Sequence, residues 1–220
     1  HRINQTGEVI QEARDIIAET RPCPLPITET FPNVMACTWD RGSQWSLDHA
    51  RQYRDEIKAW ADTGVSVCGD EKVRLAWMGN ALWSNTGFYR AFEESHGAVF
   101  VWSMYTNFLS RGYVRYFDGD PMRALAARHI SMNELLHLPP WMADWVLHEA
   151  GEMGAQGVVN LVPIGDRLSA NGTLLAKIAI EKTGLPVLDI SANMVDARAW
   201  DNDQMEAKVG RFIDEKILSP

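Results

Sequence analysis

Polar and aromatic side chains follow four short apolar runs, and they are the residues best placed to do chemistry. The runs are typical of buried strands and are Val73–Met78, Ala98–Trp102, Val158–Val162 and Leu185–Ile190. The carboxyl ends of parallel strands meet at one edge of a sheet, where open α/β domains bind their ligands. We therefore predict a substrate-binding site in the segments after these strands. The candidate binding residues are Asn80, Trp83, Asn85, Ser103, Tyr105, Asp166, Arg167 and Asn193.

Three of these candidates also have a purely structural interpretation. Asp166 and Arg167 could hold an anionic ligand, or they could be the acidic start of a helix and its surface partner. Tyr105 comes soon after Trp102, where an aromatic side chain packs more often than it reacts. The prediction of a site rests on position along the strands, and no residue is assigned a catalytic role.

The familiar catalytic and cofactor motifs are absent from the sequence. No G-x-G-x-x-G follows the first strand, and neither a phosphate-binding lysine loop nor a G-x-S-x-G turn is present. His129, His137 and His148 are too far apart to form a local metal motif. We predict no metal site on this chain.

Three cysteines, Cys23, Cys37 and Cys68, are widely spaced and include no C-x-x-C pair. This pattern argues against a disulfide framework and favours three free thiols in a reducing, cytoplasmic setting. The alternative, a cluster held by all three thiolates, has no support from their spacing.

Residues 73–102 predict a strand, helix, strand unit that positions the first two groups of candidates. A helical pattern runs from about Thr86 to Ser95, and Gly97 is well placed to end it in the left-handed conformation. Neither strand alternates apolar with polar residues, so both are expected to be buried on two faces and to run parallel.

Helical patterns flank this unit on both sides. Before it, helices are expected over about 7–20 and 46–64, with 28–40 left unassigned, so residues 1–69 predict a helical arm and connector. After it, helices are expected over about 120–129, 139–153, 168–183 and 202–217, with a loop over 130–138. Strands alternating with helices predict an α/β fold over residues 70–220: a doubly wound, mostly parallel, four-stranded sheet of the Rossmann or flavodoxin type.

Charge and composition limit the partners of this chain. The net charge is −8 over 220 residues, which gives no electrostatic case for binding nucleic acid or an anionic membrane. No apolar run approaches the roughly 20 residues of a membrane span. We expect a soluble, cytoplasmic protein that binds neither.

Several phrases, in this order, resemble a known family. RLAWMGNALW, FEESHGAVFVW, DPMRALAARHISMNELLHLPP and GVVNLVPIGDRLSANGTLLAKIAIEKTGLPVLDI are similar to the C-terminal half of 2-hydroxyacyl-CoA dehydratase and benzoyl-CoA reductase subunits. The upstream RPCPLPI and KAWADTG resemble the connector that precedes that half. Family subunits are longer, and the chain begins at His1 rather than Met, which we interpret as a partial chain.

This resemblance implies radical dehydration of a 2-hydroxyacyl-CoA, or reduction of an aromatic-ring CoA thioester. It implies a [4Fe-4S] cluster on each subunit, a homologous partner subunit in a homo- or heterodimer, and an ATP-dependent activator protein that supplies electrons. The family places cluster cysteines near Tyr105 or Thr106, near Ser131–Asn133, and at Gly165 or Asp166. None of these residues is Cys here, so we expect this chain to carry no cluster of its own.

Three hypotheses remain open from the sequence. The first is a subunit that acts on or frames an acyl-CoA or aryl-CoA thioester without its own cluster. The second is a non-catalytic scaffold subunit that pairs with a cluster-bearing homologue. The third is an unrelated flavodoxin-like binding module.

Overall fold

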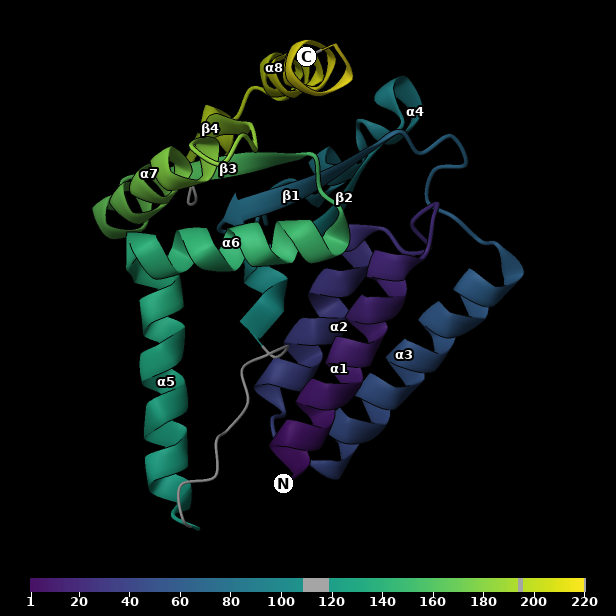
Figure 1. The fold of residues 1–220 in the computed structure, drawn as a ribbon, viewed down its shortest axis with the longest axis vertical. Coiled ribbons are helices and arrows are strands. Elements are labelled where there is room, and N and C mark those ends of the chain that lie inside the picture. The colour runs from purple at the N-terminus through teal and green to yellow at the C-terminus, as the bar shows by residue number, and fades with distance from the viewer. Residues whose placement is uncertain (109–118, 194–195, 220) are drawn as a thin grey trace.

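The fold was analysed in a computed structural model that describes residues 1–108, 119–193 and 196–219, without the side chains of 107–108, 132–137 and 168–169. One parallel sheet organises it, as predicted (Figure 1). Its strands are β1 (Val73–Gly79), β2 (Ala98–Ser103), β3 (Gly157–Ile164) and β4 (Val187–Asn193). All three neighbouring pairs are parallel, in the order β2-β1-β3-β4.

The strand order reverses direction at β1. The chain moves outward from β1 to β2, then crosses back so that β3 pairs with the other side of β1. This reversal is the doubly wound arrangement, and helices then cover both faces of the sheet. The predicted α/β fold, with a helical segment before it, is confirmed.

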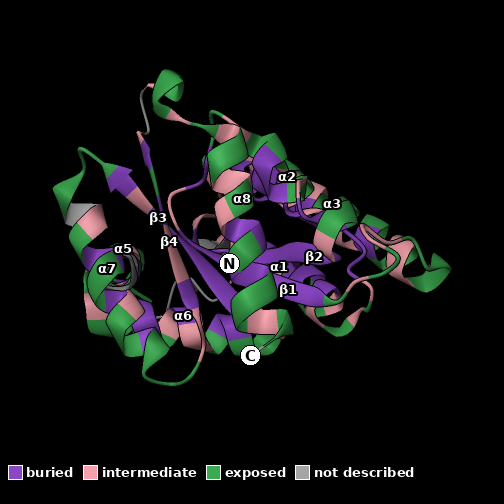
Figure 2. Ribbon diagram, turned by 90° about the horizontal axis from the view of Figure 1, so that it is seen from above, coloured by how far each residue is buried: buried purple, intermediate pink, exposed green. Residues whose placement is uncertain are grey.

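Alternate residues of β1 enter two different hydrophobic clusters. Leu75 and Trp77 face one cluster, whereas Ala76 and Met78 face the other, and all four are completely buried. Strands β1 and β2 are therefore buried on both faces, as their unbroken apolar sequences predict, whereas the edge strand β4 is partly exposed. Figure 2 shows the same pattern, with buried strands between helices whose outer sides are exposed.

Each face of the sheet has its own helical layer. On the Ala76 side lie α1 (Arg2–Glu19), α6 (Pro139–Met153) and α7 (Arg167–Glu181). On the Trp77 side lie the short helices η1 (Thr86–Arg90) and α4 (Glu93–His96), together with α8 (Asn202–Ile213) and its continuation η4 (Asp214–Leu218). Figure 1 shows α6 and α8 on opposite sides of the sheet.

Two sequence-based expectations about helices are wrong. Residues 86–95 do not form one helix but the separate turns η1 and α4, because Phe88, Tyr89 and Phe92 all bury their rings against the sheet. Residues 130–138 are not a loop, because α5 (Pro121–His137) continues through them. No glycine or proline interrupts α5 after its first residue, so nothing in the sequence ends it before Pro139.

The N-terminal segment contains three helices rather than two. Between α1 and α3 (Gln44–Thr63) lies α2 (Ile27–Trp39), in the stretch that the sequence left unassigned. Pro32 lies inside α2 and removes one backbone donor, but the helix buries Phe31 and Val34 in the two clusters. Helix α3 starts slightly earlier than residue 46, because Ser43 caps it: the Ser43 hydroxyl accepts from the Ser46 amide at 2.9 Å.

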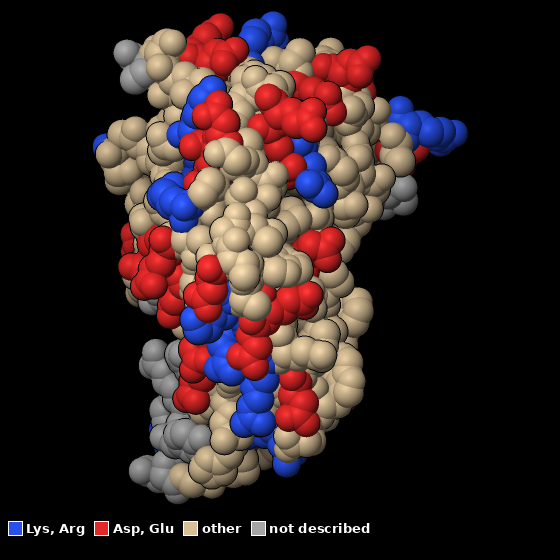
Figure 3. All heavy atoms as spheres, turned by 90° about the vertical axis from the view of Figure 1, so that its right-hand side faces the viewer, with Lys and Arg blue, Asp and Glu red and all other residues tan. Residues whose placement is uncertain are grey.

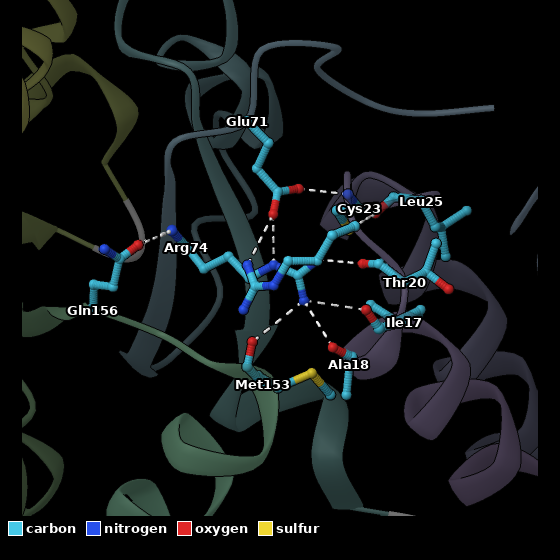
Figure 4. A network of polar contacts seen from close by, with 10 residues as sticks. Ile17, Ala18, Thr20, Cys23, Leu25, Glu71, Arg74, Met153 and Gln156 are labelled. Atoms are coloured by element: carbon cyan, nitrogen blue, oxygen red, sulfur yellow. Dashed lines mark hydrogen bonds and ion pairs between the residues drawn. The ribbon is translucent and has the colours of Figure 1, made fainter. Parts of the chain in front are cut away.

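Arg74 of β1 ties this helical segment to the sheet (Figure 4). Its side chain is fully buried and donates from Nη1 to the carbonyl oxygens of Ile17 (3.2 Å), Ala18 (3.1 Å) and Met153 (3.3 Å). The first two carbonyls lie at the end of α1 and the third at the end of α6. A buried cation therefore neutralises the carboxyl termini of two helices.

Glu71 balances the charge of Arg74 from the connector before β1. Its Oε1 accepts from Arg74 Nε at 2.7 Å and from Arg21 Nη1 at 3.1 Å, and its Oε2 accepts from the Cys23 amide. Residues 1–69 and 70–220 thus share both hydrophobic clusters and this polar network. The division of the chain at residue 69 stays a prediction.

The outer surface carries charges of both signs. Figure 3 shows Lys and Arg interspersed with Asp and Glu on the face that includes α3, where Lys58 pairs with Asp62 at 2.9 Å. Within the described part of the chain, no helix combines the length and apolar character needed to cross a membrane.

Candidate functional site

The four strands end at Gly79, Ser103, Ile164 and Asn193, and since all are parallel these ends lie at one edge of the sheet. We call this the carboxyl edge. Ser103 and Asn193 were expected in loops, but each is the last residue of its strand. The carboxyl edge is where the predicted binding residues were expected to meet.

Gly79 turns the chain sharply at the end of β1. Its φ is +92°, and a Cβ at this position would approach the carbonyl oxygen of Leu161 in β3 to 2.6 Å. Only glycine allows this conformation and this close contact between strands at low cost. The loop that follows therefore leaves the sheet in a fixed direction.

Residues 80–85 are held by hydrogen bonds to the folded core. Trp77 Nε1 donates to the Asn80 carbonyl at 2.7 Å, and the Leu82 amide donates to the Tyr89 hydroxyl at 2.8 Å. Burial raises the pKa of Tyr89, so this hydroxyl stays protonated. The loop also closes on itself, because the Asn85 amide donates to the Leu82 carbonyl at 3.2 Å.

Trp83 projects from this loop into an aromatic group. Its ring centroid lies 5.2 Å from that of Tyr105, nearly perpendicular to it, and 5.5 Å from that of Phe31. Trp83 is still 49% exposed, whereas Trp77 and Trp102 at the same edge are buried. The structure thus brings together two predicted candidates, Trp83 and Tyr105, and adds Phe31 from α2.

Ser103 lies below this aromatic group and is fully buried. Its hydroxyl accepts from the Tyr105 amide at 3.3 Å, and its carbonyl accepts from the Thr106 hydroxyl at 3.0 Å. These bonds shape the short helix η2 (Met104–Phe108) that carries Tyr105. In this structure Ser103 supports the position of Tyr105 from beneath.

Asn85 points toward α8. Its Nδ2 donates to Asn202 Oδ1 at 2.7 Å, and Asn202 also accepts from Trp200 Nε1 at 3.3 Å. Asn202 Nδ2 in turn donates to Glu206 at 2.6 Å. This chain of bonds anchors the β1 loop to the helical layer on the Trp77 side of the sheet.

The remaining candidates follow β3 and β4. Asp166 and Arg167 are exposed at the start of α7, where the Ala170 amide donates to the Asp166 carbonyl at 3.0 Å. Asn193 Oδ1 accepts from the Asp196 amide at 2.9 Å. The candidates therefore do not form one cluster. Trp83 and Tyr105 share the aromatic group, and Ser103 bonds to Tyr105. Asn80 and Asn85 lie elsewhere in the loop after β1, whereas Asp166, Arg167 and Asn193 lie at or beyond the ends of β3 and β4.

Phe31, Trp200 and Asn202 contribute to the carboxyl edge although the sequence did not indicate them. They are distant in sequence from the strand ends, and tertiary packing brings them there. Phe31 lies between Thr30 and Pro32 in the stretch that the sequence left unassigned, so no local pattern indicated it.

The three cysteines belong to or border one hydrophobic cluster, and each thiol donates to a different backbone carbonyl. Cys23 Sγ donates to the Leu25 carbonyl at 3.2 Å, Cys37 Sγ to the Ser46 carbonyl at 3.5 Å, and Cys68 Sγ to the Glu93 carbonyl at 3.1 Å. Burial raises the pKa of both Cys23 and Cys37 to about 11. These thiols are therefore protonated near neutral pH.

The family-implied cluster positions do not supply a suitable set of donors. They fall in η2, in α5 and in the turn after β3, and they hold hydroxyl, amide, thioether, glycine or carboxylate groups rather than thiols. Among the residues that the structure describes, no group of three or more His, Cys, Asp or Glu side chains is placed to hold a metal ion. The residues present do not fit an iron–sulfur cluster.

Comparison with known proteins agrees with the resemblance seen in the sequence. No curated protein matches the chain. Residues 1–215 match the family model described as 2-hydroxyglutaryl-CoA dehydratase, D-component. Because this match spans nearly the whole chain, the protein belongs to the 2-hydroxyglutaryl-CoA dehydratase D-component family.

Proposed function

We propose that this chain is a dehydratase-type subunit that binds a CoA thioester at the carboxyl edge and carries no iron–sulfur cluster of its own. The observation that carries the proposal is the half-exposed indole of Trp83 on a firmly bonded loop at the edge where α/β domains bind ligands. Membership of the family supports the choice of a CoA thioester as ligand.

The reaction that we propose for the assembled enzyme is dehydration of a 2-hydroxyacyl-CoA, with reduction of an aromatic CoA thioester as the related alternative. Its redox centre would belong to a homologous partner subunit, and an ATP-dependent activator would supply the electron. The role of this chain is then to bind and orient the thioester beside that centre. Trp83 and Tyr105 offer apolar surface to an acyl or aryl group, while Asn80 lies in the same loop.

Titration of the full chain with acetyl-CoA, monitored by isothermal calorimetry, tests the binding step. We expect saturable binding with a 1:1 stoichiometry, and we expect CoA to compete. A chain that binds neither ligand, alone or with a homologous subunit, would contradict the proposal.

Iron and acid-labile sulfide analysis tests the second part of the proposal, that the chain carries no iron–sulfur cluster. Protein purified without oxygen should contain no stoichiometric iron or sulfide, because the three family-implied positions lack thiolates. About four iron and four sulfide per chain would show that the chain does hold a cluster.

A scaffold role is the second candidate, and the outer face of α7 favours it. Leu174, Leu175 and Ile178 share this face and are 39%, 54% and 51% exposed, which suits contact with another subunit. A scaffold would form a complex with its homologue but leave CoA thioesters unbound. Size-exclusion chromatography of the mixture, followed by the same titration, separates the two roles.

A further inference from the structure

Trp83 differs from Trp77 and Trp102, the two strand tryptophans at the carboxyl edge, in being open to solvent. Trp77 and Trp102 are 0% and 2% exposed, whereas Trp83 is 49% exposed despite its ring contacts with Phe31 and Tyr105. Leaving half of an indole in water forgoes a large part of the stabilisation that burial of this side chain would give. The position of Trp83 is therefore not explained by packing of the core.

The exposed indole of Trp83 lies on a loop that hydrogen bonds hold in place. Hydrogen bonds fix residues 80, 82 and 85 around it, and the Trp83 amide itself donates to the Ala81 carbonyl at 3.0 Å. Gly79 sets the direction of the loop through its close approach to Leu161. A rigid, half-exposed indole is preorganised to receive a flat ring, because little ordering is then needed on binding.

We propose that Trp83 is a stacking platform for a planar aromatic ring of the bound thioester. Two parts of such a ligand have this shape, the adenine of CoA and an aryl group on the acyl side. Stacking of a nucleobase on an aromatic side chain contributes about 1–3 kcal/mol as measured by alanine substitution. This inference rests on the proposed binding of a CoA thioester and names the part of the ligand that Trp83 contacts.

Three variants and three ligands test the platform. Trp83→Ala removes the ring, Trp83→Leu keeps apolar volume without an aromatic face, and Trp83→Phe keeps a smaller face. The ligands are CoA, benzoyl-pantetheine, which lacks adenine, and acetyl-pantetheine, which lacks both rings. Calorimetry on the full chain gives the affinities, and near-UV circular dichroism checks that each variant is folded.

We expect Trp83→Ala and Trp83→Leu to weaken the binding of a ring-bearing ligand by about 5- to 150-fold. Trp83→Phe should retain most of the affinity, and acetyl-pantetheine should bind all variants equally. A loss confined to CoA identifies adenine as the stacked ring, and a loss confined to benzoyl-pantetheine identifies the aryl group.

Trp39→Ala is the matched control. Trp39 is 79% exposed on the same helix as Phe31, eight residues or about 12 Å further along it, and its removal should leave every affinity unchanged. If wild-type protein binds CoA and the Trp83 variants bind both ring-bearing ligands as tightly, the platform is wrong while the proposed function stands. If Leu serves as well as Trp, the contact is apolar rather than stacking, and the inference is also overturned. If the wild type binds none of the three ligands, either alone or with a homologous subunit, both the inference and the proposed function are overturned.

Discussion

Gly79 shows how one residue sets the geometry of the carboxyl edge. Its φ is positive, and a Cβ at this position would clash with the backbone of β3. Only the steric contact is specific to the position in the sheet, since Gly64 at the end of α3 has a similar φ of +75° but no atom within 4 Å of its hypothetical Cβ. Comparison of the two positions therefore separates the energetic cost of backbone strain from that of a steric clash.

Replacement of each glycine by alanine measures these two effects. Gly64→Ala should lower the free energy of unfolding by about 1 kcal/mol, the cost of a left-handed alanine. Gly79→Ala should lower it by about 3 kcal/mol, because the clash with Leu161 adds to the strain. Urea denaturation gives both values, and equal losses would show that β1 and β3 separate easily at this point.

The cysteines provide a second prediction at the residue scale. With a pKa of about 11, Cys23 and Cys37 hold roughly one thiolate in a thousand at pH 8, so iodoacetamide should modify the partly exposed Cys68 first. Mass spectrometry of peptides after timed labelling identifies the modified thiols. Rapid labelling of Cys23 or Cys37 in native buffer would contradict the burial described here.

The same thiols make the fold sensitive to alkali. Their pKa is higher in the folded chain than the ordinary value of 9.0, so the folded state keeps protons that the unfolded state releases. Their contribution is thus fully present below pH 9 and declines as pH rises from about 9 to about 11. Between pH 8 and pH 10, the urea midpoint should decrease less in a Cys23→Ala/Cys37→Ala variant than in the wild type.

At the scale of elements, Arg74 determines how α1 and α6 end against β1. Arg74→Met would leave the carbonyls of Ile17, Ala18 and Met153 without their buried donor. It would also remove the buried cationic partner of Glu71, which keeps only its bonds from Arg21 and the Cys23 amide. We expect a loss of about 3–5 kcal/mol in the free energy of unfolding. Arg51→Met, which removes an exposed pair with Asp48, should change it by less than about 0.5 kcal/mol. Similar small losses for both would show that the buried network contributes little.

The whole molecule depends on packing between its N-terminal helices and its sheet. Residues such as Ile10 and Phe31 share hydrophobic clusters with β1, and Arg74 links both parts. We therefore predict that residues 1–69 and 70–220 unfold together in one transition. Far-UV circular dichroism and tryptophan fluorescence should give coincident urea curves, and two separated transitions would show that the segments fold independently.

The sequence by itself determined the class of fold, because unbroken apolar runs separated by helical patterns can bury both faces only in a covered parallel sheet. It also placed most strand ends within a few residues and identified the family through the order of its phrases. Local patterns were insufficient where distant residues decide the outcome. The sequence leaves residues 28–40, which contain Pro32, unassigned, although burial of Phe31 stabilises a helix there. Residues 86–95 form separate turns because their aromatic rings pack against the sheet.

Only the tertiary structure decided how the candidate residues are distributed along the carboxyl edge. Ser103 supports Tyr105 from below, Asn85 bonds to Asn202, and Trp83 stands half-exposed between Tyr105 and Phe31. The bond between Asn85 and Asn202 joins residues 117 positions apart, and Trp83 meets Phe31 of α2, so no local spacing encodes these two contacts. The period of a sequence fixes which face of a strand or helix is apolar, but the docking of one element on another fixes which side chains meet.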